Sequence, residues 1–363
     1  MDREQLYDFV AQRTSRCKIL VVGDVMLDKY YYGEVTRISP EAPVPITHVL
    51  SEKETLGGAA NVAHNLALLG CETSITGFVG DDYHCQSLLD KFTARGIDYH
   101  GLITTDRPTT TKLRVIGGHQ QMMRLDFEES APITGPYAER FLNYIHQKLN
   151  ESLDCVIISD YGKGSCTEEN CRKIIEACHA HGVPIVFDPV GAGGTTFRTQ
   201  AALRLLDELP MAVIRGNASE ITCLAAHKSG QDFGVDSRLG PADPALASSL
   251  ASHLGTTVAI TGAVDVLSDG RQTAEIHNGC PMLTYVTGTG CMTTSLIASF
   301  AAVADPFTAA AGGILAMGIG GELALAGEGK NGPGTFHARL FDAFYQLDDA
   351  ILQKYGKVVV HRE

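Results

Sequence analysis

The chain is poor in positive charge. Its 363 residues include 29 Lys and Arg against 42 Asp and Glu, which gives a formal net charge of −13 at pH 7. A protein that binds duplex nucleic acid needs a basic face to displace counterions, so this balance argues against that class of partner. Any cationic side chain that matters is therefore expected to act locally, inside a site.

A secretory signal and a membrane span are also missing from the pattern. The first 18 residues, MDREQLYDFVAQRTSRCK, contain acids and no apolar core of the signal-peptide type, which favours a cytoplasmic protein. The apolar stretch 309–321 stops at Glu322, short of the ~20 residues that a membrane span needs. We expect a buried, closely packed helix there and no membrane partner.

The ten cysteines lack the spacing of a zinc site. They are scattered along the chain without a signal peptide, so we expect reduced thiols rather than disulfides. The densest set is Cys166, Cys171 and Cys178 with His179 and His181, and it has no two-residue gap of the kind typical of zinc pairs. We interpret Cys171 and Cys178, seven residues apart, as one core-facing stripe of a helix.

Apolar, β-branched runs that end in Gly or Asp alternate with segments of helical spacing. The runs are KILVVGD (18–24), TSITGFVGDD (73–82), DCVIISDYGKG (154–164), VPIVFDPVG (183–191), MAVIRGN (211–217) and TVAITG (257–262). Helical segments such as NVAHNLALLG, CQSLLDKFTARG and CRKIIEACHAHG lie between them and end in Gly. This alternation predicts an α/β fold with a mainly parallel central sheet covered on both faces, whose ligands collect at the carboxyl ends of the strands.

Two stretches, 30–55 and 109–127, break this rhythm because their residues alternate without intervening helices. We predict that they form a small β-lid over the main sheet, which is also a natural dimer surface. Pro40, Pro43 and Pro45 limit strand pairing there and protect an edge. No linker or repeat is visible, so we expect one main domain plus this lid.

Polar residues gather at strand ends in the N-terminal half. Asp24 and Asp28 follow the first strand, where carboxylates can accept hydrogen bonds from vicinal sugar hydroxyls; the alternative is turn or helix capping. Lys163 stands between two glycines after another strand and is a candidate point charge for a phosphate, or else a solvated lysine.

A glycine pair, Gly57 and Gly58, opens a segment of helical spacing. Two glycines allow a ligand to approach backbone amides at the positive end of a helix, and Asn61, one turn further on, can bond a hydroxyl. The alternative is a tight turn before a core helix. We keep both interpretations for this pair.

The stretch VTGTGCMTTS (286–295) has the pattern of a phosphate-binding loop before a helix. Two glycines, Gly288 and Gly290, fold the loop, and we interpret Cys291 as the first helical side chain, pointing at the ligand. A thiol titrates near pH 8.5, and a helix N-terminus can lower that value. We therefore predict that Cys291 accepts or positions a proton of the acceptor, a role for which a carboxylate is more usual.

The N-terminal half, from about residue 15 to Asp188, resembles the kinase domain of bacterial heptose 7-phosphate kinases, members of the ribokinase (PfkB) superfamily. The resemblance rests on GDVMLDKYYYGEVTRISPEAPVPI, GGAANVAHNLALLG, TKLRV, RLDFEE and SDYGKG. After Asp188 the chain instead resembles hydroxyethylthiazole kinases, on DPVGAGGTTFRT, AVIRGNASEI, VAITGAVDV, VTGTGCMTTSLIASF and GPGTF. We interpret the chain as a recombinant of two kinases, with halves 1–188 and 189–363, either a natural fusion or an engineered chimera.

The two resemblances imply a three-layer α/β/α ribokinase-like fold that uses ATP and Mg²⁺. They imply that Asn217 and Glu220, in the run NASE, organise magnesium through its waters, although this run is also compatible with a helix cap. Arg215, Thr261 and Gly262 would contact ATP; a surface ion pair is the alternative for Arg215.

The same resemblance makes Gly288 and Gly290 an anion hole for the transferring phosphoryl group. Cys291 stands where most relatives, including the heptose kinases, have an aspartate that deprotonates the acceptor hydroxyl, and hydroxyethylthiazole kinases have cysteine there.

The sequence predicts an ATP-dependent small-molecule kinase. The acceptor pocket of this superfamily draws on the N-terminal half and the lid, so we expect a sugar or sugar phosphate such as heptose 7-phosphate. Hydroxyethylthiazole kinase activity, or a nucleotide-binding chimera without activity, are the alternatives. No nucleotidyltransferase segment of the HxGH type is visible. We expect a homo-oligomer, either a dimer through the lid or a trimer like the thiazole kinases. The tail LQKYGKVVVHRE is expected to add an edge strand or to stay mobile.

Overall fold

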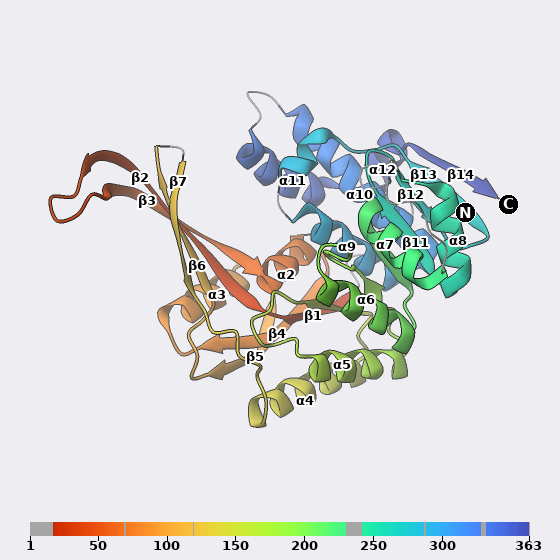
Figure 1. Cartoon of the computed structure of the whole chain (residues 1–363), viewed down its shortest axis with the longest axis horizontal. Coiled ribbons are helices and arrows are strands. Elements are labelled where there is room, and N and C mark those ends of the chain that lie inside the picture. The colour runs from red at the N-terminus through yellow and green to blue at the C-terminus, as the bar shows by residue number, and fades with distance from the viewer. Residues whose placement is uncertain are drawn as a thin grey trace.

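The structure is a computed structural model that describes residues 17–68, 70–118, 120–229, 242–286, 288–327 and 332–362 (Figure 1). Residues 1–16, for which the sequence predicts no signal peptide, lie outside the described residues. Thr287 of the phosphate-loop pattern also lies outside them.

The N-terminal half builds a four-stranded parallel sheet in the order β5-β4-β1-β8. Its strands are β1 (Lys18–Gly23), β4 (Glu72–Gly80), β5 (Asp98–Thr105) and β8 (Cys155–Ser159). Successive side chains of β1 point to opposite faces. Ile19 therefore packs with α2 (Ala59–Leu68) and α3 (Tyr83–Thr93), whereas Leu20 packs with α4 (Pro136–Asn150) and α5 (Glu168–Ala180). Helices thus cover both faces.

The C-terminal half builds a six-stranded sheet in the order β14-β13-β12-β11-β10-β9. Its strands are β9 (Val186–Phe187), β10 (Val213–Asn217), β11 (Thr257–Thr261), β12 (Asp265–Ser268), β13 (Gln272–Ile276) and β14 (Val358–Arg362). β9, β10 and β11 run parallel, and the remaining pairs are antiparallel. The tail of the chain therefore takes the first of its two expected forms, an edge strand.

Helices cover both faces of this second sheet as well. The first face packs on α10 and α12, and the second on α6, α7 and α8, while α9 and α11 pack beside α10. The bounds are α6 (Thr196–Glu208), α7 (Ala218–Ser229), α8 (Pro244–Leu254), α9 (Thr289–Ala301), α10 (Pro306–Ala326), α11 (Pro333–Gln346) and α12 (Asp349–Tyr355), with a 3₁₀ turn, η3 (Pro281–Tyr285). The expected three-layer α/β architecture is confirmed.

The expected single central sheet is divided into two at the seam between the halves. No ladder joins β8 to β9 in the described part of the chain. The run 183–191 was predicted as a full strand, but only two of its residues pair, because Pro184 and Pro189 lack an N–H and Val190 turns back to donate to Asp188. Helix α9 bridges the gap, since Ala298 packs in the N-terminal core and Ile297 in the C-terminal one.

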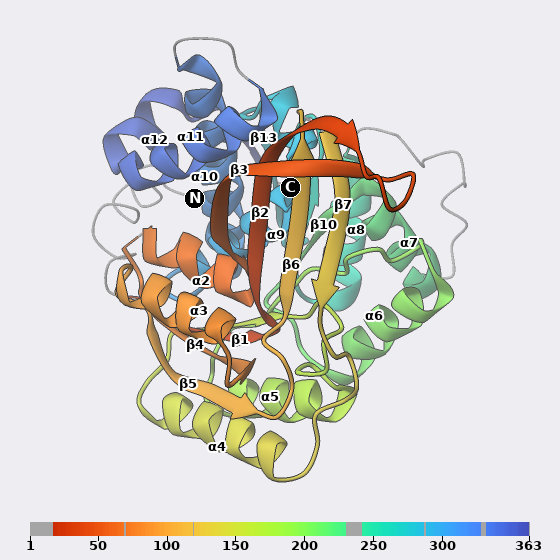
Figure 2. The same ribbon diagram turned by 90° about the vertical axis from the view of Figure 1, so that its left-hand side faces the viewer.

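A separate four-stranded sheet, the lid sheet, projects from the N-terminal half (Figure 2). Its order is β3-β2-β6-β7, and its strands are β2 (Val25–Ile38), β3 (Pro45–Gly58), β6 (Thr111–Gly117) and β7 (Gln120–Phe127). β2 continues almost directly from β1, so the sheet starts five residues before the predicted stretch at 30. Its role as a lid stays a prediction.

Helix α10 is longer than the Gly-rich apolar stretch that predicted it. It has 21 residues rather than the 13 of 309–321, and it is the one helix in the described residues that is long and apolar enough to cross a membrane. However, 78% of its apolar window is buried inside the protein. A Cβ at Gly313 would lie 2.4 Å from the backbone nitrogen of Ile297, so the glycine is needed for close packing on α9. The expected buried helix is present, although it is longer.

Candidate active site

Helix α9 begins at the glycine loop of the C-terminal half. Gly288 is its N-cap, with a left-handed φ of 93° that favours glycine, and no side chain caps this end. Thr289 is the first helical residue, so the prediction that Cys291 holds this place is wrong by two positions. The cause is that Gly288 rather than Gly290 makes the cap. Cys291 is exposed at the third position.

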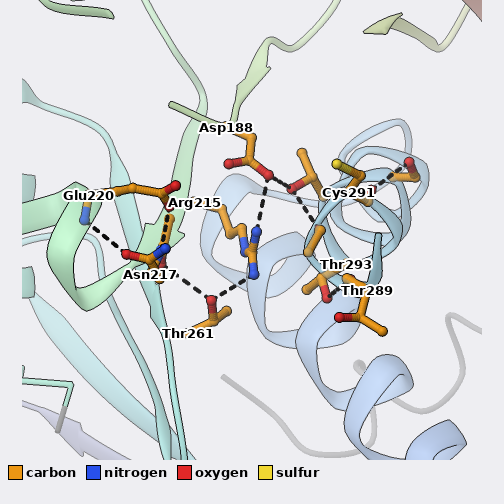
Figure 3. Close-up of polar contacts among 12 residues, drawn as sticks. Asp188, Arg215, Asn217, Glu220, Thr261, Thr289, Cys291 and Thr293 are labelled. Carbon is orange, nitrogen blue, oxygen red and sulfur yellow. Dashed lines mark hydrogen bonds and ion pairs between the residues drawn. The ribbon is translucent and has the colours of Figure 1, made fainter. Parts of the chain in front are cut away.

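Arg215, in the middle of β10, extends its guanidinium to this helix start. A Cβ on Gly290 would come within 2.9 Å of Arg215 Nη1. Nη1 donates to Asp188 Oδ2 at 3.0 Å, and Nη2 donates to Thr261 Oγ1 at 2.7 Å (Figure 3). Arg215 is only 9% exposed, which rules out the alternative of a surface ion pair. The structure thus brings Arg215, Thr261 and Gly290 together.

Asp188 is a site residue that the sequence reasoning did not assign. Its Oδ2 also accepts a hydrogen bond from Thr294 Oγ1 at 2.6 Å, so it joins α9 to Arg215. Its other oxygen, Oδ1, and Arg215 Nε are buried without a hydrogen-bond partner among the described residues. The available signal was an acid directly after an apolar strand, which is the same pattern that singled out Asp24.

Asn217 and Glu220 form a reciprocal cap at the start of α7. Asn217 Oδ1 accepts from Glu220 N and Glu220 Oε2 accepts from Asn217 N, both at 2.9 Å. Glu220 Oε1 accepts from the Gly191 amide at 2.8 Å, which ties this cap to the loop that follows Asp188. The helix-cap alternative is therefore present, and a role of Glu220 in holding magnesium stays a prediction.

A cavity of about 580 Å³ opens beside Arg215, a size usual for small-ligand sites. Its polar lining includes Arg215, Thr261, Gly262, Thr289 and Gly290, four of which the sequence predicted as site residues. Its apolar wall comes from η3 and α10, with Leu283, Ile314 and Met317. Asn217, Glu220 and Cys291 do not line it.

Asp265 also lines this cavity and was not predicted. Its Oδ1 accepts a hydrogen bond from the Gly262 amide at 2.8 Å. Burial raises the pKa of Asp265 to about 6, while the Gly262 amide and the Arg215 charge act in the opposite direction. A carboxyl group of this kind is partly protonated near pH 6 and can donate or accept a hydrogen bond.

In the N-terminal half, Asp24 binds the loop that follows β8. The carboxylate is 2% exposed and accepts from the amides of Tyr161 at 2.8 Å, Lys163 at 2.9 Å and Ser165 at 3.3 Å. The capping alternative is therefore present for Asp24, which organises the 160–165 loop. Direct contact between Asp24 and an acceptor stays a prediction.

Two ion pairs surround this loop at the base of the lid sheet. Asp28 Oδ1 accepts from Arg114 Nη1 at 2.5 Å, and Lys163 Nζ lies 2.7 Å from Glu128 Oε1. The side chain of Lys163 is 16% exposed, so the alternative of a solvated lysine is wrong. Sequence reasoning found one partner of each pair and missed the other, because Arg114 comes from β6 and Glu128 from the segment directly after β7.

The glycine pair lies at the junction of the lid sheet and α2. A Cβ on Gly57 would come within 2.4 Å of Asp28 Oδ2, and Gly58 has a left-handed φ of 53°. Asn61 lies half-buried in the first turn of α2. Both glycines are thus required by close approach and turn geometry, and their contact with a ligand stays a prediction.

The thiol of Cys291 is not activated in the way the sequence suggested. Cys291 is exposed as a residue, but the protein around its sulfur removes part of the water from the thiol. This desolvation, and after it the negative charge of Asp188, raise the pKa of Cys291; Arg215 and the thiol's own backbone amide lower it less. The expected lowering by the helix N-terminus is therefore wrong, and the thiol stays protonated at neutral pH. Cys291 can donate or position a proton but is a poor base.

Tyr161 connects the two halves electrostatically. Burial raises the pKa of Tyr161; the Cys291 sulfur, when it is a thiolate, and the carboxylates of Asp28 and Asp24 raise it further. The residue is 47% exposed. The sequence reasoning quoted this tyrosine within SDYGKG but gave it no role.

Comparison with known proteins supplies the family. A model of the hydroxyethylthiazole kinase family matches residues 163–350, more than half of the chain. The chain belongs to this family. The hydroxyethylthiazole kinase of Thermoanaerobacter pseudethanolicus is 42% identical over 200 residues, which cover 54% of this chain and 75% of that protein.

This member of the hydroxyethylthiazole kinase family has a second resemblance, to the bifunctional protein HldE of Magnetococcus marinus. The two are 45% identical over 192 residues, which cover 51% of this chain and 39% of HldE. The chain therefore spans about two fifths of the length of that relative. Both predicted resemblances are confirmed, although the family match starts at residue 163, upstream of the predicted seam at Asp188.

Solved structures support the ribokinase-like fold. Ribokinase from Thermotoga maritima superposes with a TM-score of 0.54 at 17% identity, covering 89% of this chain and 99% of that one. At this identity the likeness concerns the fold alone. The structural likeness extends across both halves of the chain. This member of the hydroxyethylthiazole kinase family therefore combines segments similar to two kinases in one ribokinase-like fold.

Proposed function

We propose that the chain is an ATP-dependent kinase that transfers the γ-phosphate to a hydroxyl of a sugar or sugar phosphate, such as heptose 7-phosphate. The observation that carries the proposal is the start of α9, which Gly288 caps and where Gly290 stands beside the buried Arg215 at the edge of a cavity of about 580 Å³. A helix start over a fixed guanidinium is suited to bind phosphate groups.

ATP fits the C-terminal cavity by its chemistry. The apolar wall of Leu283, Ile314 and Met317 can pack against a base, and the phosphates would extend toward Arg215 and Gly290. Arg215 is held by Asp188 and Thr261, so its charge is already oriented before the nucleotide binds.

The residues around Asp188 also fit a magnesium ion. Its Oδ1 is a buried carboxylate oxygen without a partner, and Glu220 lies in the adjoining loop network, where it would act through water. When bound, the ion would neutralise charge on the phosphates during transfer. The chain's own part is to hold Asp188 in place through Arg215 and Thr294.

The acceptor hydroxyl would lie between Cys291 and the 160–165 loop. Phosphoryl transfer has a loose transition state, so orientation of the hydroxyl matters more than a strong base. Cys291, protonated at neutral pH, would position the hydroxyl rather than deprotonate it. The acids and ion pairs of the N-terminal half, including Asp28 with Arg114, are the kind of groups that bind polyhydroxyl compounds.

Hydroxyethylthiazole is the second candidate acceptor. The family match over residues 163–350, which includes Cys291, favours it. The HldE-like half favours the sugar, because that half contributes Asp24, Asp28 and Lys163 to the acceptor side. A nucleotide-binding protein without activity is the third outcome, since a misplacement of about 1 Å between halves can lower the rate about 100-fold.

Release of ADP measures all three outcomes. The chain is incubated with ATP, Mg²⁺ and one acceptor at a time: heptose 7-phosphate, ribose, a fructose phosphate or hydroxyethylthiazole. We expect ADP release that depends on the sugar phosphate and a decrease of at least about 100-fold in Arg215→Met. Release that depends only on hydroxyethylthiazole would replace the proposed acceptor, and ATP binding without acceptor-dependent release would refute the kinase.

The proposal extends to the location and the oligomeric state of the enzyme. A cytoplasmic location suits a kinase that uses ATP and a small-molecule acceptor. The lid sheet exposes several apolar side chains, which supports self-association through it: Ile38, Val49, Leu50, Met123 and Phe127. Sedimentation at increasing protein concentration distinguishes a dimer from the trimer expected by resemblance to thiazole kinases.

A further inference from the structure

Two cysteines flank the start of α5, directly after the loop that Asp24 organises. Thr167 is the N-cap of this helix, and its Oγ1 accepts a hydrogen bond from Asn170 N at 3.1 Å. Cys166 therefore stands one residue before the cap and Cys171 at the fourth helical position. Side chains at these two positions pack against each other across a helix start, where they fix the direction of the entering chain.

The two thiols lie on either side of the Thr167 cap and are partly accessible. The neighbouring Cys171 side chain, followed by burial, raises the pKa of Cys166 well above its ordinary value. Both side chains are half-buried, whereas Cys17, Cys155 and Cys178 lie in the core. A small oxidant can therefore reach the pair more readily than those three buried thiols.

We propose that Cys166 and Cys171 form a reversible disulfide that locks the 160–165 loop on the acceptor side of the site. The oxidant is a low-molecular-weight disulfide such as oxidised glutathione. The Cys171 sulfur attacks it as a thiolate, forms a mixed disulfide and releases one glutathione thiolate. The Cys166 sulfur then attacks Cys171 Sγ and releases the second glutathione. The two protein protons end on the two reduced glutathione molecules, so the step balances.

The disulfide acts on the loop because Cys166 is its immediate neighbour. Ser165 donates its amide to Asp24 and accepts from Asn170 Nδ2 at 3.1 Å, so the loop and the start of α5 already form one network. Closing a covalent ring of about six residues at this point opposes local opening of the loop. Tyr161 and Lys163, whose amides donate to the same carboxylate oxygen of Asp24, would lose freedom to adjust to an acceptor.

The first test maps the thiols and needs no substrate. The full-length chain is equilibrated with oxidised glutathione, alkylated and digested with trypsin, which cuts after Lys163 and Arg172. Peptide 164–172 then contains both cysteines. We expect this peptide to lose two hydrogens and to resist alkylation, reversibly on reduction. If it retains two alkylatable thiols, or if it binds glutathione at both, the proposal is wrong.

The second test measures the loop by amide hydrogen exchange. Residues 160–165 should exchange at least about tenfold more slowly in the oxidised chain. Cys171→Val, which keeps an apolar contact with Cys166 but has no thiol, should show no change on oxidation, and Cys223→Ser should behave as the parent chain. Equal exchange in the oxidised and reduced parent would refute the locking of the loop.

A third measurement rests on the proposed function. Oxidation should raise KM for the acceptor and leave the ATP Kd unchanged, because the cavity beside Arg215 lies in the other half. If the chain turns over no acceptor, the proposed function fails while the first two tests still decide the disulfide. If an active chain oxidises without a change in KM, the effect on the acceptor site is refuted.

Discussion

The substitution Gly290→Ala tests the phosphate site with a single methyl group. The new Cβ would lie 2.9 Å from Arg215 Nη1, closer than such atoms come in folded proteins, so one of the two must move. The guanidinium cannot swing away freely because Asp188 and Thr261 hold it at 3.0 and 2.7 Å. We therefore expect the start of α9 to shift instead.

The magnitude follows from this conflict. Overpacking by one carbon in a rigid environment costs about 1–3 kcal/mol, against a gain of up to about 1 kcal/mol for replacing glycine by alanine in a helix. A displacement approaching 1 Å at a phosphate site lowers turnover about 100-fold. We expect an ATP Kd at least about tenfold higher, since about 1.4 kcal/mol corresponds to a factor of ten.

Gly334→Ala is the matched control. Gly334 is the second residue of α11, as Gly290 is of α9, but a Cβ there meets no atom within 4 Å. Isothermal titration gives the ATP Kd of both variants, and thermal unfolding shows that both fold. If Gly290→Ala binds ATP as tightly as Gly334→Ala, the contact between the helix start and Arg215 is not part of a phosphate site.

Three further predictions concern the thiol, a buried carboxyl and the 160–165 loop. Cys291→Ala should lower the rate of acceptor-dependent ADP release about tenfold or more if the thiol orients the hydroxyl, whereas turnover equal to the parent would exclude this role. Asp265 has a pKa of about 6 in the folded chain and 3.8 in the unfolded chain. Its ionisation therefore destabilises the fold: the effect is absent below pH 4, grows as the pH rises to about 6 and is constant above that. Asp265→Asn keeps an acceptor for the Gly262 amide. In denaturant unfolding, this variant should be more stable than the parent by up to about 3 kcal/mol at pH 7.5 and equally stable at pH 4. Equal stability of the two proteins at both pH values would contradict the raised pKa. Asp24→Asn should destabilise the fold by about 1–3 kcal/mol and speed hydrogen exchange of the 160–165 loop, because three amides lose a charged acceptor, and unchanged exchange would show that the loop is held by other contacts.

Much of the fold was predictable because the strands are continuous apolar runs. The runs 18–24, 211–217 and 257–262 became β1, β10 and β11 within a residue or two. The run 183–191 did not, because its prolines and the turn at Asp188 remove donors that a ladder needs. Hydrophobic pattern alone does not register the loss of an N–H.

The candidate site was predictable where glycines and strand ends identify it. Arg215, Thr261, Gly262 and Gly290 line one cavity, as their short motifs suggested, although Arg215 stands in the middle of β10. The partners of the charged residues were not predictable. Arg114 reaches Asp28 from β6, and Glu128 reaches Lys163 from just after β7; no local pattern encodes such pairs.

The sequence by itself determined the alternation of strands and helices, the glycine loop before α9 and the resemblance of each half to a kinase, because these depend on local periodicity and short motifs. Only the tertiary structure decided what each polar group does. It pairs Asp188 with Arg215, uses Asp24 to bind three amides and raises the pKa of Cys291 through burial and the charge of Asp188. Burial and charge depend on neighbours from distant parts of the chain, and folding alone brings these together.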